Sequence, residues 1–263
     1  MRISIVTPVL HGMPWLPEAV ESVARQRMDV DVEHLIRDGG STDGSREWLT
    51  AHEDLGYRAT FDRDRGQTDA LIAGFAAATG DIFGWLNADD LLEPGALRRV
   101  AEAFEANPDA VIVSGACLLI GPDGAVLGPI PTPPRPEFDR LLRHPNNLAQ
   151  PATFFRAEAY RQVGGLDRHF DLAMDVDLWF RLASTGRVVL LGDGGLARFR
   201  LRPNAKGVRA AAAACREDLR IRRRYGMPWL SPAGRSLLKH SLFLIPLWRA
   251  KGLARRVLRR RAD

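Results

Sequence analysis

Acidic side chains stand at three places in this chain where a strand-like or helix-like segment begins or ends. One place is Asn87-Ala-Asp-Asp90, where two adjacent acids repel each other unless a cation or solvent compensates their charge. Hard divalent cations take carboxylate oxygens and usually keep water and substrate phosphates as further ligands. The pattern therefore indicates a cation or phosphate site, although helix capping explains the same residue types.

A second acidic place, Asp38-Gly-Gly-Ser-Thr-Asp43, also follows a strand-like run. Its glycines allow a ligand to approach the backbone closely, and the N–H groups of the helix that follows favour anions. Asp38 is then positioned to accept hydrogen bonds from a base or a ribose. Arg65, in the loop before the next helix, offers a phosphate contact. A capped turn and an exposed loop without a ligand explain the same residues, and both interpretations stay open.

The third place holds Asp175 and Asp177 at the start of a helix-like segment. Residues two apart cannot share one face of a helix. We therefore expect one carboxylate to point into a cleft, while the other caps the helix or pairs with Arg181 four residues further on. An acid pair that only complements the helix dipole is the open alternative.

The elements that must position these side chains alternate regularly over the first half of the chain. The strand-like runs cover residues 3–7, 30–37, 58–62, 81–86 and 110–120, and the helix-like runs cover residues 14–27, 43–52, 68–79 and 95–106. This rhythm predicts an α/β fold with a mostly parallel sheet flanked by helices. Ligands bind at the carboxyl ends of such strands, where Thr7-Pro8 and the first two acidic places would meet.

The second half is less regular. Gly121-Pro-Asp-Gly124 predicts a hairpin, and the five prolines in residues 129–136 predict a linker or mobile loop. Further runs predict short helices at 157–163 and 175–185, strands at 187–191 and 196–201, and a longer helix at 208–225.

Composition favours a protein of the cytoplasm. Cys117 and Cys215 are far apart and form no metal-binding pattern, so we expect reduced thiols and no structural zinc. The N-terminus is too short and too interrupted by proline for a signal peptide. The longest apolar run, residues 241–248, is shorter than the roughly 20 residues that a bilayer span needs.

The basic character of the chain is concentrated at its C-terminal end. Residues 235–263 contain nine Lys or Arg against one acid, whereas residues 1–234 contain 28 basic and 31 acidic residues. Apolar, aromatic and basic residues mix over 236–261, which is typical of an anchor on an anionic membrane. We therefore expect peripheral contact with the inner face of the cell membrane. A terminal helix packed on the domain is the alternative.

Three other classes of protein fit less well. No GxGxxG follows the first strand, which argues against a dinucleotide-dependent oxidoreductase. The segment Pro8-Val-Leu-His-Gly-Met-Pro14 lacks the Gly-rich loop with Arg and Lys that a sugar nucleotidyltransferase would usually carry there. The acidic balance of residues 1–234 argues against binding of nucleic acid.

Seven stretches, in this order, resemble the family 2 glycosyltransferases of the GT-A fold. They are Val6-Thr-Pro-Val9, Asp38-Gly-Gly-Ser-Thr-Asp43, Gly66-Gln-Thr-Asp-Ala70, Ala78-Thr-Gly-Asp-Ile82, Trp85-Leu-Asn-Ala-Asp-Asp90, Gln150-Pro-Ala-Thr-Phe-Phe155 and Asp175-Val-Asp-Leu-Trp179. Each alone is weak, but seven in family order are highly specific. They span roughly residues 1–205.

The resemblance implies a role for individual residues. The nucleotide side would consist of Thr7, Pro8, Asp38, Arg65, Asn87 and Ala88. Asp89 would bind Mg²⁺ or Mn²⁺, as the last acid of the family's DxD signature, and Asp175 would be the catalytic base. Gln150 and Trp179 would shape the acceptor side.

The implied reaction transfers a sugar from a nucleotide diphosphate sugar, by family habit a UDP-sugar, to a hydroxyl of a saccharide or lipid-linked acceptor. One in-line displacement inverts the anomeric centre, and the expected setting is synthesis of bacterial surface polysaccharide or glycolipid. The implied domains are a GT-A domain over 1–207 and a helical basic extension over 208–263. Within the former, residues 1–120 would bind the nucleotide and residues 121–207 would supply the acceptor and catalytic half.

Two departures from the family pattern affect the metal. Asn87 replaces the first acid of the signature, and Arg202 stands where relatives often have a histidine. An arginine there could neutralise a diphosphate directly. The alternative function is a catalytically inactive protein that binds a nucleotide sugar.

Overall fold

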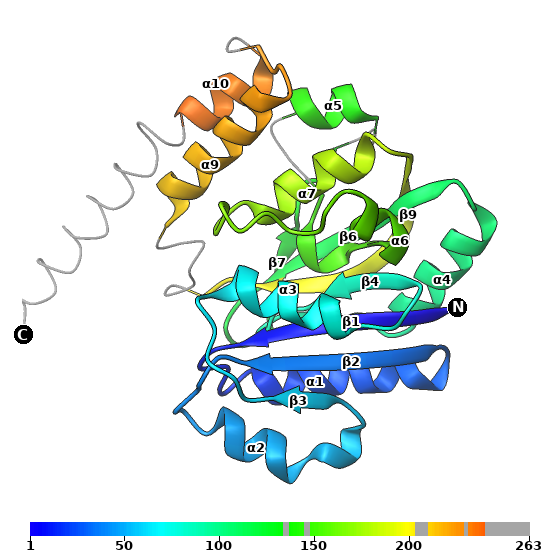
Figure 1. Ribbon diagram of the computed structural model, residues 1–263, viewed down its shortest axis with the longest axis vertical. Helices are drawn as coiled ribbons and strands as arrows, with labels where there is room; N and C mark the ends of the chain where they lie inside the picture. Colours follow the sequence, from blue (N-terminus) through cyan, green and yellow to red (C-terminus); the bar gives the residue numbers. More distant parts are fainter. Residues whose placement is uncertain (134–136, 145–147, 203–209, 229–230, 240–263) are drawn as a thin grey trace, which may run out of the picture.

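The computed structural model describes residues 1–133, 137–144, 148–202, 210–228 and 231–239. Its centre is a nine-stranded sheet in the order β3-β2-β1-β4-β8-β6-β9-β5, with β7 paired to β6 (Figure 1). The sheet is mixed but mostly parallel in its N-terminal part, and helices flank it. The predicted α/β sheet is therefore confirmed.

The N-terminal part follows the predicted alternation closely. Its strands are β1 (Arg2–Val9), β2 (Asp31–Asp38), β3 (Arg58–Thr60) and β4 (Ile82–Trp85), and its helices are α1 (Leu16–Ala24), α2 (Ser45–Ala51), α3 (Gln67–Ala77) and α4 (Ala96–Ala106). Nearly every residue of β1 is buried, as expected for a parallel strand covered on both faces.

Register brings the polar clusters to one edge of the sheet. In the β1–β2 pair Val9 lies opposite Asp38, and in the β1–β4 pair Val6 lies opposite Trp85. The chain segments that follow β1, β2 and β4 therefore leave the sheet side by side. This arrangement brings the first two acidic places to the same end of the sheet, on either side of β1.

Five further strands follow β4 along the chain in a less regular arrangement. They are β5 (Leu91–Leu92), β6 (Ala110–Ile120), β7 (Val126–Pro129), β8 (Thr153–Arg156) and β9 (Arg187–Arg200). The β6–β7 pair is antiparallel, so the predicted hairpin is confirmed. The expectation of two strands at 187–191 and 196–201 is wrong, because β9 runs through both and register shifts around Ala116 of β6 accommodate the glycines between them.

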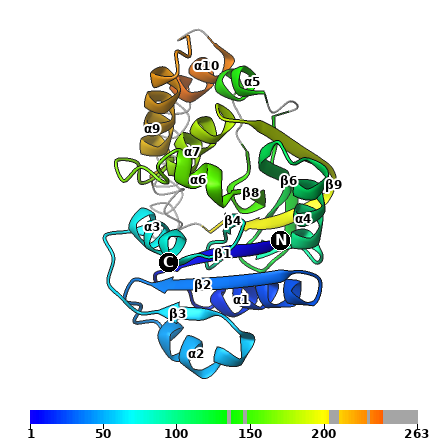
Figure 2. The same ribbon diagram turned by 45° about the vertical axis from the view of Figure 1, so that its right-hand side comes forward.

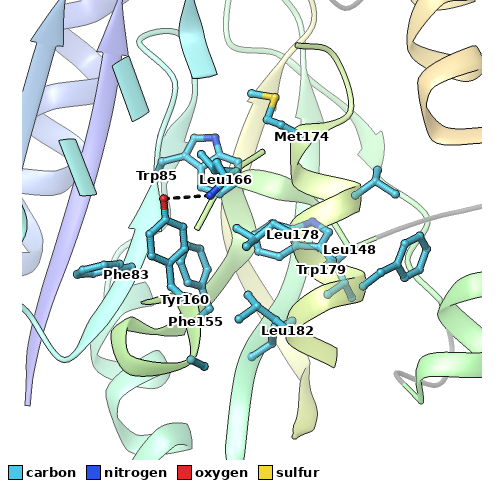
Figure 3. Packing of buried hydrophobic residues seen from close by; sticks show 14 of the residues in the cluster. Phe83, Trp85, Leu148, Phe155, Tyr160, Leu166, Met174, Leu178, Trp179 and Leu182 are labelled. Carbon is cyan, nitrogen blue, oxygen red and sulfur yellow. Dashed lines mark hydrogen bonds between the residues drawn. The ribbon is translucent and has the colours of Figure 1, made fainter. Parts of the chain in front are cut away.

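The core is dominated by aromatic rings from distant parts of the chain (Figure 3). Trp85 and Trp179 stack with ring centroids 5.5 Å apart, and Phe155 packs at 5.6 Å from Trp179. Figure 3 also shows Tyr160, whose hydroxyl accepts a hydrogen bond from the Leu166 N–H at 3.3 Å. These contacts fasten α7 (Met174–Ala183) to the end of β4.

The C-terminal helices are joined to the same core. The views place α9 (Ala211–Arg224), α10 (Pro232–Lys239) and α5 (Phe138–Arg143) at the end of the molecule opposite α2 (Figures 1 and 2). Arg222 is fully buried and donates from Nη1 to the carbonyls of Leu141, Leu142 and His144 at 2.8–2.9 Å. Among the described residues, no helix has the length and apolar character needed to cross a membrane.

Candidate active site

A cleft opens at the carboxyl ends of β1 and β4 and extends to the first turn of α7. We call it the central cleft, and its volume is about 340 Å³. Its lining combines apolar and polar side chains: Pro8, Val9, Leu10, Gln67, Trp85, Asn87, Ala88, Asp89, Gln150, Asp171, Leu172, Met174, Asp175, Phe199, Arg200 and Arg202. Of the residues that we predicted from the sequence, Pro8, Asn87, Ala88, Asp89, Gln150 and Asp175 are brought together here.

The side-chain amide of Asn87 links three polar side chains at the cleft by hydrogen bonds. Its Oδ1 accepts a hydrogen bond from Gln67 Nε2 at 2.7 Å. Its Nδ2 donates to Asp90 Oδ2 at 3.0 Å and to Gln150 Oε1 at 3.1 Å. An aspartate at this position would offer no donor and would add charge beside Asp90. Asn87 is therefore suited to this network rather than being only a weakened acid.

Asp90 is a structural acid of this network. It is 1% exposed, and its Oδ1 accepts a hydrogen bond from the Arg200 N–H at 2.9 Å. Burial, together with the neighbouring charge of Asp89, raises the pKa of Asp90 to about 8. Both carboxyl oxygens are hydrogen-bonded within the protein, and the buried side chain does not line the cleft.

Asp89 is held by two arginines of β9 and the residues after it. The Arg200 Nε–H donates to the Asp89 carbonyl at 3.0 Å, and Arg202 Nε forms an ion pair with Asp89 Oδ2. The guanidinium of Arg202 also lies over the Trp15 ring, with Cζ 4.8 Å from the ring centroid. Asp89 is therefore fixed in place, with an arginine at its carboxylate.

The described residues do not form the donor set of a divalent cation. They contain no group of three or more His, Cys, Asp or Glu side chains able to hold one. Asp89 is engaged by Arg202, Asp90 is buried and hydrogen-bonded through both oxygens, and the Asn87 carbonyl oxygen accepts from Gln67. The expectation that Asp89 binds Mg²⁺ or Mn²⁺ thus gains no support from this geometry.

Asp175 is distant from Asn87, Asp89 and Asp90 in the sequence but lines the same cleft, in the first turn of α7. Its Oδ1 accepts a hydrogen bond from the Val176 N–H at 2.9 Å. Burial, together with the charges of Asp218 and Glu217 on α9, raises the pKa of Asp175 to about 6 against the lowering effect of that hydrogen bond. A carboxylate of this kind is ionised near neutral pH and is a stronger base than an ordinary aspartate.

Glu217 was not identified from the sequence. Its Oε2 accepts hydrogen bonds from the N–H groups of Leu172 and Ala173 at 2.9 and 3.0 Å, directly before α7. It therefore holds the segment that leads into Asp175. No local signal marks this role, because α9 and α7 meet only in the folded chain.

Asp177 points away from the cleft. Its Oδ2 pairs with Arg181 at 2.7 Å, and only 5% of its side chain is exposed. Arg181 Nη1 also donates to the carbonyls of Val163 and Gly165. The prediction that the two acids of this helix diverge, one to a cleft and one to Arg181, is confirmed.

Two of the expected nucleotide-binding residues, Asp38 and Thr7, are buried and do not line the cleft. Asp38 is 1% exposed, and its Oδ1 accepts from the N–H groups of Gly40 and Ser41 at 2.7 and 2.8 Å. Its Oδ2 is buried without a hydrogen-bond partner among the described residues. Thr7 Oγ1 is hydrogen-bonded to His34 Nε2 at 2.9 Å, and burial lowers the pKa of His34 to about 3, so the imidazole is neutral. The unpartnered Asp38 oxygen remains an acceptor that a ligand reaching it could use.

Two other predicted contacts lie away from the cleft. Trp179 is fully buried and stacks on Trp85, so it can shape the cleft only through Trp85, which lines it. Arg65 is largely exposed and pairs with Asp69 at 2.8 Å, outside the residues that line the cleft. A nucleotide contact of Arg65 stays a prediction.

This fold and site belong to a known class of enzyme. Residues 4–162, more than half of the chain, match the family described as Glycosyl transferase family 2, and the chain is a member of that family. It is therefore a glycosyltransferase. A PGL/p-HBAD biosynthesis glycosyltransferase of Mycobacterium bovis is 30% identical over 190 residues, which cover 71% of each chain. An uncharacterized glycosyltransferase of Nostoc is 33% identical over 129 residues, but this match spans only 40% of that relative.

Solved structures show the same GT-A fold. A mannosyltransferase from Pyrobaculum calidifontis in complex with GDP-Man and Mn²⁺ matches with a TM-score of 0.64 and 21% identity, over 92% of this chain and 70% of that one. S. aureus TarS residues 1–349 in complex with UDP-GlcNAc matches with a TM-score of 0.63 and 13% identity, over 92% and 72%. The expected fold class is confirmed.

Proposed function

We propose that this enzyme transfers a sugar from a nucleotide diphosphate sugar to an acceptor hydroxyl with inversion at the anomeric carbon, and that Asp175 is the catalytic base. The observation that carries the proposal is one cleft lined both by a carboxylate of raised pKa, Asp175, and by the Asp89–Arg202 pair. A cleft with a base at one part and a cationic group at another suits deprotonation of an acceptor and departure of an anionic group.

In the proposed step the acceptor hydroxyl gives its proton to Asp175 as its oxygen forms a bond to the anomeric carbon. The bond between that carbon and the diphosphate oxygen breaks, and its electron pair leaves with the nucleoside diphosphate. Attack on the face opposite the leaving group inverts the anomeric centre. Because the displacement is single and direct, one carboxylate base suffices, whereas a glycosidase needs two.

Binding of the donor is tested by thermal unfolding with UDP, GDP, dTDP and CMP. A ligand that binds the native state raises the melting temperature by mass action. We expect one nucleoside diphosphate to do so, and UDP is the first candidate because of the family resemblance. A shift with none of the four would contradict a nucleotide-sugar donor.

Catalysis is tested with the sugar donors of the nucleotide that binds. Asp175→Asn is expected to keep donor binding and lose sugar transfer, and the product anomer is read by NMR coupling constants. Measurable transfer in the wild type, absent in the variant, separates an enzyme from a protein that only binds nucleotide sugars. Retention of configuration in the product would refute the single displacement.

We also propose that the C-terminal end contacts an anionic membrane, close to a lipid-linked or saccharide acceptor at the inner face of the cell membrane. Exposed basic residues on the described part of α9 and α10 support it: Arg216, Arg220, Arg223, Arg224, Arg235 and Lys239. Most of the basic segment 236–261 lies outside the described residues. Co-sedimentation of the full chain with anionic vesicles tests the contact, and comparison with a chain ending at Lys239 tests the contribution of residues 240–263. Equal binding of the two chains would show that residues 240–263 do not contribute to membrane binding.

A further inference from the structure

We infer that Arg202 itself receives the diphosphate of the donor, in the role that a divalent cation bound by the protein would otherwise fill. The inference rests on the proposed function, since it assumes a nucleoside diphosphate as the donor's leaving group. It concerns how that group is held and predicts that binding does not require a metal ion.

The position of Arg202 is built by the fold. Its Nε is committed to Asp89 Oδ2, and its guanidinium plane is supported by the ring of Trp15. Trp15 is in turn fastened by a hydrogen bond from its Nε1 to the Pro122 carbonyl at 3.1 Å, on the hairpin between β6 and β7. Three separated parts of the chain therefore hold one guanidinium at the cleft.

The outer edge of that guanidinium is available to a ligand. The side chain is 29% exposed, and among the described residues its hydrogen bonding uses Nε alone. The two Nη groups present a fork of N–H donors, which matches the geometry of phosphate oxygens. Arg202 can thus donate to a diphosphate while Asp89 holds it from behind.

Arg202 is also the better placed of the two cationic side chains that line the described part of the cleft. The other, Arg200, is 2% exposed and is used internally, by the carbonyls of Asp89, Gly121 and Pro122 and by the carboxylate of Glu18. Acids are abundant beside them, because Asp89, Asp171 and Asp175 line the same cleft. A dianionic group entering this cleft needs a positive partner, and Arg202 supplies one.

The same contacts leave little for a cation. The Asp89 carboxylate, the natural ligand of a hard divalent ion, is already paired through Oδ2 with Arg202 Nε. The Asn87 side-chain oxygen accepts a hydrogen bond from Gln67, and Asp90 Oδ1 accepts one from the Arg200 N–H. A set of oxygen ligands for a divalent cation and the guanidinium of Arg202 cannot both occupy the position beside Asp89. The structure has the guanidinium there.

The test is titration calorimetry of the full chain with UDP and GDP, each in EDTA and each with Mn²⁺, and with the matching nucleosides. We expect one diphosphate to bind in EDTA with an affinity within about threefold of that with Mn²⁺. Charge-assisted hydrogen bonds are each worth about 1.5–3 kcal/mol, so Arg202→Ala is expected to weaken diphosphate binding about 10- to 100-fold in EDTA. Binding of the nucleoside is expected to stay unchanged in this variant.

Two further variants sharpen the result. Arg202→His removes the fork and places an imidazole, a common metal ligand, beside Asp89, so diphosphate binding should become dependent on Mn²⁺. Arg187→Ala removes one positive charge from the exposed start of β9, the strand that ends just before Arg202, and should leave binding unchanged. Thermal unfolding of each variant checks that it is folded.

The outcomes are separable. Binding by the wild type that disappears in EDTA, or that Mn²⁺ strengthens more than tenfold, would overturn the inference and leave the proposed donor intact. Equal diphosphate affinity of the wild type and a folded Arg202→Ala variant would also overturn it. Failure of every nucleotide to bind in either buffer would contradict the proposed function, and the inference with it.

Discussion

Replacing the proposed base should make the protein more stable. The pKa of Asp175 is raised to about 6 by burial, whereas an aspartate in an unfolded chain titrates near 3.9. The folded state therefore holds the proton more tightly than the unfolded state, and folding stability falls as pH rises from about 4 to about 6. At about 1.4 kcal/mol per pKa unit, the ionised carboxylate costs the folded state roughly 3 kcal/mol at pH 7.

An asparagine at this position keeps the acceptor for the Val176 N–H and cannot ionise. Asp175→Asn is therefore expected to raise the free energy of unfolding by about 2–3 kcal/mol at pH 7 and by almost nothing at pH 4. Urea unfolding at the two pH values measures the difference, and the melting temperature at pH 7 should rise by about 4–10 °C. A gain of equal size at both pH values, or a loss at pH 7, would refute the argument from the raised pKa.

The neighbouring acid provides the control. Asp177 is almost fully buried and paired with Arg181. Asp177→Asn therefore removes the counter-charge of an arginine whose side chain is only 21% exposed. We expect this variant to lose about 3 kcal/mol at pH 7. Two identical substitutions in one helical turn should thus change stability in opposite directions, which a general effect of charge removal on α7 cannot produce.

Three further outcomes follow from the packing. Glu217→Gln keeps an acceptor at the start of α7 but removes a negative charge that raises the pKa of Asp175, so the acidic limb of the kcat–pH profile should move to lower pH; an unmoved limb would argue against this coupling. Gly74→Ala would place a Cβ 2.4 Å from Cγ1 of Val6, and urea unfolding should show a loss of about 1–3 kcal/mol. Arg222→Met leaves the α5 carbonyls without their buried donor and should cost about 3 kcal/mol; unchanged stability would show that α9 is not anchored in this way.

The parallel half of the fold could be predicted from residue patterns because its determinants are local. β1 and β6 are long, mostly apolar and bounded by turn residues, so their periodicity and ends appear in the sequence itself. β5 and β8 were not predicted. They have two and four residues, and they are strands only because β9 and β6 offer them partners far along the chain.

Much of the candidate site followed from the same local rules. Parallel strands that end in polar residues must gather those residues at one edge, which explains why Pro8, Asn87 and Asp89 were predicted to meet. Helical geometry alone required Asp175 and Asp177 to diverge. These statements needed only the spacing of residues and the type of element that carries them.

Side-chain partners were decided by the tertiary structure. Asn87 is a hub because Gln67 and Gln150 reach it from different elements, and Arg202 meets Asp89 across 113 positions of sequence. The family resemblance implies that Trp179 shapes the acceptor side, and only the packing against Trp85 shows that its side chain is completely buried. Residue type and spacing determine which side chains come to one edge of a sheet; which of them pair, and which remain exposed to a ligand, depends on long-range packing that buries one group and leaves its neighbour open.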